Sequence, residues 1–105
     1  MPTNRLEVLR SLVARNPGDA FARYGLAMEL LQSGQTPEAV EEFRQLLEAH
    51  PNYVAGYFHG GQALEKLDRV EEARALYEAG IAAATRSGDA HARSELQAAL
   101  DLLPI

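Results

Sequence analysis

Three histidines and several adjacent carboxylates are the side chains of this sequence that could take part in acid–base or metal chemistry. His50, His59 and His91 lack the i, i+4 spacing that places two imidazoles on one metal ion. The sequence contains no cysteine, which excludes thiolate zinc sites, disulfides and cysteine nucleophiles. These residues therefore predict neither a metal site nor a cofactor.

Two pairs of carboxylates, Glu41-Glu42 and Glu71-Glu72, are adjacent in sequence. In a helix, adjacent side chains point about 100° apart, so neither pair forms a shared acid–base site by its spacing. We expect both pairs to lie on solvated helix faces. The four serines have no nucleophile-elbow or other activating context. The sequence thus predicts no enzyme and no small-molecule substrate.

The length and the charge of the chain narrow its class further. Its 105 residues suit one domain, and 47% apolar with 24% charged residues is an ordinary globular balance. A net charge of −5 argues against a phosphate-binding surface, so we expect no nucleic-acid partner. No apolar stretch near the start suits a signal peptide, and no uncharged apolar run approaches the roughly 20 residues of a membrane span. We expect a soluble, cytoplasmic protein without a membrane partner.

Between clusters of Gly, Pro and Asn, the apolar residues recur every three or four positions, which predicts helices rather than strands. The predicted helices span residues 4–15, 19–33, 37–49, 53–67, 71–86 and 89–102. Asp19, Asp89 and Thr36 are expected to cap helix N-termini. Gly34 and Gly88 suit the left-handed geometry that ends many helices. The predicted fold class is all-α.

The sequence also repeats itself at an offset of 34 residues, which places Pro17 on Pro51 and Leu30 on Leu64. Two helices per period is the pattern of a helical repeat, in which each unit is one helical hairpin. Repetition of this kind decides the architecture before any single motif does.

Each hairpin needs a small residue where its two helices cross closely. Gly61 is expected to cross against Ala73, and the closeness of that approach offsets the cost of a helical glycine, about 1 kcal/mol relative to Ala. Phe43 and Tyr77 are expected to fill the space between one unit and the next.

This pattern resembles the tetratricopeptide repeat family, whose consensus runs W-x2-L-G-x2-Y, then A-x3-F, then P, over 34 residues. The residues that match or conservatively replace it are Leu26, Ala27, Leu30, Ala39, Phe43 and Pro51 in the first copy, and Tyr57, Gly60, Gly61, Leu64, Ala73 and Tyr77 in the second. The chain departs from the consensus at Arg23, where the family prefers Trp, and at Thr85, where it prefers Pro. Gly60 also stands where the family prefers Leu. The resemblance implies a short right-handed α-solenoid of antiparallel helix-turn-helix units.

Within a single domain over residues 1–105, the resemblance covers repeat 1 at 20–53 and repeat 2 at 54–87. Residues 4–15 look like the second helix of a preceding repeat, and 89–102 look like the closing helix of the family. The pentatricopeptide repeats have a similar period but read single-stranded RNA through a basic groove. Fifteen acidic against ten basic residues argue against that rival family.

In the tetratricopeptide repeat family, the first helix of each repeat lines a concave surface on which partner peptides bind. The groove residues that the resemblance implies are Phe21, Tyr24, Met28, Leu31, Phe58, His59, Gln62 and Lys66, with Gly25, Gln32, Glu65 and Arg93 beside them. Helix 19–33 is apolar on nearly all sides, so it needs apolar partners all round. The alternative, that neighbouring helices bury both of its apolar stripes, stays open at this point.

One subclass of the family clamps the C-terminal carboxylate of chaperone tails with Lys and Asn in the groove. The corresponding positions here hold Tyr24-Gly25 and Phe58-His59, which argues against that ligand. A groove lined by aromatic and Met side chains better fits an amphipathic helix or an apolar extended segment.

Two classes of function remain. The first is a non-catalytic adaptor that binds a protein or peptide partner in the groove. The second is an assembly unit that self-associates, as a homo-oligomer, or stacks on another helical domain through its open ends. Exposure of Leu6 and Val8 on the first helix would favour the assembly unit.

Overall fold

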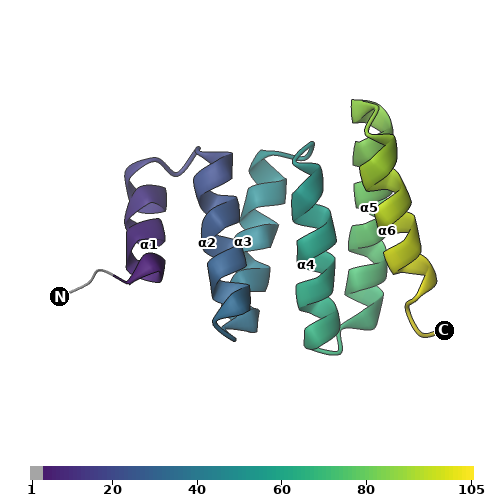
Figure 1. The fold of residues 1–105 in the computed structure, drawn as a ribbon, viewed down its shortest axis with the longest axis horizontal. Helices are drawn as coiled ribbons and strands as arrows, with labels where there is room; N and C mark the ends of the chain where they lie inside the picture. Colours follow the sequence, from purple (N-terminus) through teal and green to yellow (C-terminus); the bar gives the residue numbers. More distant parts are fainter. Residues whose placement is uncertain (1–3) are drawn as a thin grey trace.

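The computed structural model of the chain describes residues 4–105, and within this range it contains six helices and no strand. They are α1 (Arg5–Arg15), α2 (Ala20–Gln32), α3 (Thr36–Ala49), α4 (Val54–Lys66), α5 (Val70–Ser87) and α6 (Ala90–Asp101). Figure 1 shows them as an ordered row, with α1 at one end of the long axis and α6 at the other. The all-α prediction is confirmed, and each helix ends within one residue of its predicted bounds.

Two of the three predicted N-terminal caps are confirmed. The Asp19 carboxylate accepts a hydrogen bond from the Ala22 amide at 3.1 Å, and the Asp89 carboxylate accepts one from the Ala92 amide at 3.0 Å. These bonds satisfy amides that have no partner inside the helix. Both predicted left-handed glycines, at the ends of α2 and α5, also have positive φ angles.

The third predicted cap is wrong. Thr36 is the first residue of α3 and is buried, while Gln35 occupies the capping position without a side-chain hydrogen bond to the helix. Pro37 explains why the helix can begin without such a bond. A proline in the first turn carries no amide proton, so one of the amides that a cap would satisfy is absent.

The helices form an inner and an outer row. Each helix packs against the next along the chain, so that α2 with α3 and α4 with α5 form two hairpins. In addition, α2 approaches α4 and α4 approaches α6, whereas α3 and α5, both fully described, do not approach each other in this way. Because the row of α2, α4 and α6 is the tighter one, the stack curves around it, and this row forms the concave side.

Glycines allow the close packing of α4 against its neighbours. A Cβ atom on Gly61 would lie 2.2 Å from Cε1 of Tyr77, whose ring is fully buried. The nearest side chain to Gly61 is therefore Tyr77 rather than Ala73, and the Tyr77 ring packs inside the α4–α5 hairpin instead of only between units. Phe43 does lie between units, since its Cβ is 3.3 Å from where a Cβ on Gly60 would be.

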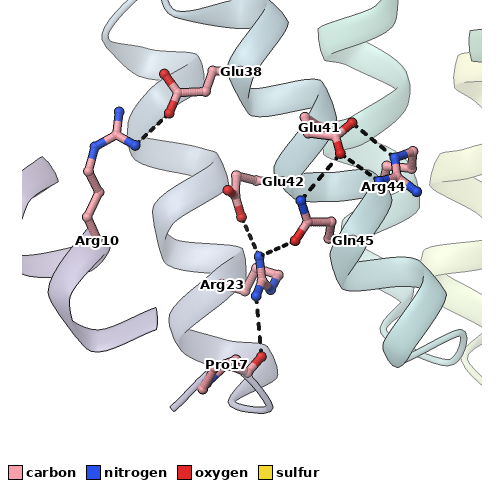
Figure 2. A network of polar contacts seen from close by, with 8 residues as sticks. All are labelled: Arg10, Pro17, Arg23, Glu38, Glu41, Glu42, Arg44 and Gln45. Carbon is pink, nitrogen blue, oxygen red and sulfur yellow. Dashed lines mark hydrogen bonds and ion pairs between the residues drawn. The ribbon is translucent and has the colours of Figure 1, made fainter. Parts of the chain in front are cut away.

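A polar network joins α2 to α3 at the position where Trp is the family preference (Figure 2). The guanidinium of Arg23 donates hydrogen bonds to Glu42 at 2.7 Å, to Gln45 at 3.0 Å and to the Pro17 carbonyl at 3.4 Å. The side chains of Arg23 and Glu42 are only 13% and 16% exposed. The prediction that Glu42 lies on a solvated face is therefore wrong. Its neighbour Glu41 is exposed, as are both carboxylates of the second pair, in agreement with the prediction.

Candidate functional site

The groove residues inferred from the sequence differ strongly in exposure. Phe21 is 76% exposed, and Tyr24, Met28, Phe58 and His59 are half-buried. The two polar members of the set on α4 are exposed. This pattern leaves apolar and aromatic atoms of α2 and α4 open to solvent beside polar groups.

Leu31 has to be removed from the set. It is 8% exposed and belongs to the buried core cluster together with Leu26, Ala27 and Leu30. Neighbouring helices thus bury one apolar stripe of α2 and part of the other, so the two alternatives left open by the sequence each hold for part of the helix.

A run of aromatic rings crosses the concave side from α2 to α5. The Tyr24 ring lies 5.2 Å from Tyr53 and 6.0 Å from His59, measured between ring centroids. His59 lies 5.2 Å from Phe58, which in turn lies 6.5 Å from Tyr77. The sequence-predicted aromatic residues of the two repeats are thus brought together through His59 into one continuous strip.

Burial changes the protonation of three of these rings. Burial lowers the pKa of His59 below its ordinary value, against the opposing effects of a hydrogen bond with Gln62 and of the charge on Glu95. Burial, and less strongly the neighbouring Tyr53, raise the pKa of Tyr24. The pKa of Tyr77 is also raised, first by burial and then by the hydrogen bond to a carboxylate on α4. The strip is therefore uncharged at neutral pH.

An N-terminal cavity of about 490 Å³ lies between α1 and α2. It brings together Phe21, Tyr24 and Met28, as the sequence suggested, with Leu9 and Leu12 from α1. The two leucines were missed as surface residues because the period assigned α1 to the second-helix row. Their spacing relative to Phe43 and Leu46 predicted packing positions, and an exposed fraction of 44% at Leu12 shows that this packing is incomplete.

A C-terminal cavity of about 340 Å³ lies between α4 and α6. Its lining residues from α4 are Phe58, Gln62 and Glu65, while Glu95 and Leu102 line it from the α6 side. A second hollow of about 310 Å³ shares Phe58 and Glu95 with it and adds His59. The closing helix therefore contributes a carboxylate and an exposed leucine that the sequence analysis did not assign to the groove.

Two residues that the resemblance placed in or beside the groove lie elsewhere or at its margin. Arg93 lines a separate small hollow with Thr85 and Gly88, where α5 turns into α6. Lys66 is exposed at the end of α4 but does not line the C-terminal cavity.

The outer row holds a further apolar cavity, of about 460 Å³, in the gap between α3 and α5. Its apolar lining includes Val40, Leu47 and Leu76, and Arg44 and Glu72 lie at its edge. Arg44 is itself paired with carboxylates of α3, so positive and negative charges alternate there. The apolar outward positions of the second helices were the sequence signal for this cavity.

The chemistry available on these surfaces is binding. Among residues 4–105, no three side chains of the metal-binding types come close enough together to hold an ion. The pair formed by Glu65 and Tyr77, whose oxygens lie 2.5 Å apart, keeps the phenol protonated and its ring buried. Over the same residues, none of the helices has the length and apolar character needed to cross a membrane.

Comparison with known proteins agrees with this architecture. The tetratricopeptide repeat family model matches residues 24–90. A TPR repeat-containing protein of Pseudomonas aeruginosa is 31% identical over 91 residues, which cover 87% of each chain. The solution structure of a tetratricopeptide repeat domain protein from Salinibacter ruber is 40% identical, with a TM-score of 0.76 over 81% of this chain and 86% of that one. PcrH, solved in complex with the chaperone-binding region of PopD, shares the fold at 16% identity, with a TM-score of 0.86 over 91% of this chain and 73% of its own.

The two hairpins, their period and the concave inner row define a short helical-repeat protein. The chain belongs to the tetratricopeptide repeat family.

Proposed function

We propose that this protein is a non-catalytic interaction module that binds a segment of a protein partner on its concave surface. The observation that carries the proposal is the strip of half-buried rings on α2 and α4, in which Tyr24 and Phe58 are joined through His59. Aromatic side chains that are partly exposed beside a cavity are the usual anchors of a binding surface. Each of the two has an open cavity beside it.

Two further facts support a peptide-like partner. Phe21 and Met28 extend the strip along α2, and long, adaptable apolar side chains accept helices or extended segments of varied shape. The similar fold of PcrH is solved with a region of PopD, so a scaffold of this shape accommodates a segment of another protein. The absence of Lys and Asn at the positions of Tyr24 and Phe58 argues for a partner other than a chaperone tail.

The test compares two substitutions on the same helix. A partner is captured from native cell extract, its bound segment is mapped, and the segment is titrated by calorimetry into Phe58→Ala and Lys66→Ala. We expect Phe58→Ala to weaken binding at least about tenfold, because it removes a desolvated aromatic anchor. Lys66→Ala should change the affinity little at physiological salt, because an exposed rim charge contributes little.

Both variants must first keep the wild-type helical spectrum and melting temperature, since Phe58 also packs against the core. Wild-type affinity in a folded Phe58→Ala variant would exclude the concave surface as the binding site.

Self-association is the second candidate function, and the open face of α1 favours it. Val8 is 43% and Leu12 is 44% exposed, whereas Leu6 is half-buried. Apolar side chains of this size on one helix are suited to packing on another helical surface. Light scattering over a range of concentrations separates the two functions: a mass that stays monomeric favours the adaptor, and a mass that rises favours assembly.

A further inference from the structure

The C-terminal cavity between α4 and α6 combines an apolar wall with carboxylates from both helices. Phe58 and Ala99 form part of the apolar wall, and Leu102, 85% exposed, extends it. Glu65 enters from α4 and Glu95 from the α6 side. None of the lining residues carries a positive charge.

We propose that the partner segment is basic and places a Lys or Arg side chain in this cavity. The proposal rests on the function proposed above and names the chemistry of its partner. The aliphatic stem of such a side chain covers the apolar wall, while its cationic group reaches the carboxylates. A cation near the Phe58 ring also gains from the negative face of the ring.

The two carboxylates differ in how they are held. One oxygen of Glu65 accepts the Tyr77 hydroxyl proton at 2.5 Å, which fixes the carboxylate and leaves its other oxygen to accept further bonds. Glu95 lies 3.3 Å from Nε2 of His91 on the same helix, and both side chains are exposed. His59, which faces the neighbouring hollow, stays neutral at neutral pH because burial lowers its pKa. The local charge is therefore negative.

Other occupants fit this cavity less well. A purely apolar segment would take two carboxylates out of water without pairing them, which is unfavourable. An acidic segment would add a third negative charge at the same place. A segment that combines apolar residues with one or more cations satisfies both the wall and its edges.

The experiment selects ligands without assuming their sequence. A displayed library of random 12-residue peptides is selected on the full chain, and a selected peptide is then measured by fluorescence polarisation. We expect the selected pool to be enriched in Lys and Arg over the starting library. Replacing the enriched residue by an uncharged analogue of similar length, citrulline for Arg or norleucine for Lys, should weaken binding about tenfold.

Three substitutions that remove one negative charge each identify the carboxylates involved. Glu65→Gln and Glu95→Gln should each weaken the selected peptide about three- to tenfold and reduce the salt dependence of its affinity. Glu65→Gln keeps an oxygen that can accept the Tyr77 hydroxyl proton, so the fold is preserved. Glu78→Gln, at an exposed position of α5 away from the cavity, is the matched control and should leave the affinity unchanged.

The outcomes separate this inference from the proposed function. Peptides that require Phe58 but are not enriched in Lys or Arg, or that bind both Gln variants as tightly as wild type, would overturn the basic-partner inference alone. Peptides that bind Phe58→Ala at wild-type affinity, or a pool without enrichment over the starting library, would overturn the proposed function as well.

Discussion

Gly61→Ala tests the tightest helix contact in the molecule. The added Cβ would lie 2.2 Å, 2.6 Å and 2.7 Å from three atoms of the Tyr77 ring. That ring has no room to move, since it is fully buried and its hydroxyl is bonded to Glu65. Overpacking of this kind costs about 1–3 kcal/mol, and we expect the upper end because the obstacle is a ring rather than a flexible chain end.

The substitution also has a favourable contribution, because Ala is a better helix former than Gly by about 1 kcal/mol. The net change for Gly61→Ala is therefore a loss of about 2 kcal/mol, or a decrease of roughly 8–16 °C in the melting temperature of a domain of this size. Urea unfolding followed by circular dichroism measures the free energy of unfolding directly.

Gly25→Ala is the matched control, since Gly25 also lies inside a first helix. Its added Cβ would lie 3.3 Å from the end of the Leu9 side chain, which is half-buried and can move by a few tenths of an ångström. We expect this variant to be as stable as wild type or more stable, by up to about 1 kcal/mol. If Gly61→Ala proved as stable as Gly25→Ala, the close packing of α4 on Tyr77 would be wrong.

Three further predictions concern the core, the strip and the polar network. Ala73→Leu should lower the urea midpoint by the equivalent of about 1–3 kcal/mol, because Ala73 has no exposed surface and a larger side chain has nowhere to go. His59 has a pKa below the ordinary 6.5, so its contribution to stability is complete above pH 6.5 and is lost as the pH falls below that value. In urea unfolding, His59→Gln should therefore lose less stability between pH 7 and about pH 5 than His91→Gln, which changes an exposed histidine. Arg23→Met should cost about 1–3 kcal/mol by leaving Glu42 partly buried without its partner, and a double-mutant cycle with Glu42→Gln should give a coupling near 1 kcal/mol or more; additive effects would mean that the pair does not hold α2 to α3.

The fold was predictable because two independent periods agree in this sequence. Apolar spacing located each helix to within one residue, and the offset of 34 residues set the order of hairpins. Sequence spacing could not resolve the rotation of each helix about its axis to the same degree. Ala73 and Tyr77 are four residues apart and share a helix face, so spacing alone does not tell which of them meets Gly61.

The candidate site was less predictable for the same physical reason. Because α2 is apolar nearly all round, its sequence does not say which stripe the neighbouring helices cover, and Leu31 proved to be in the core. Glu42 was likewise indistinguishable from Glu41 until Arg23 was placed opposite it. The signal for that contact was present, however, as a charged residue at a position where the family prefers Trp.

The amino acids of α4 are divided between packing and an open surface. Its smallest residues, Gly56, Gly60 and Gly61, face Leu46, Leu47, Phe43, Leu76 and Tyr77 of the flanking helices. Each helical glycine costs about 1 kcal/mol relative to Ala, which close packing offsets. The larger Phe58 and Gln62 are left for the concave side, where Phe58 remains only half-buried. A helix that builds its core contacts from glycines while leaving a phenylalanine partly in water has unused apolar surface on one face, and a partner segment would complete the burial of that face.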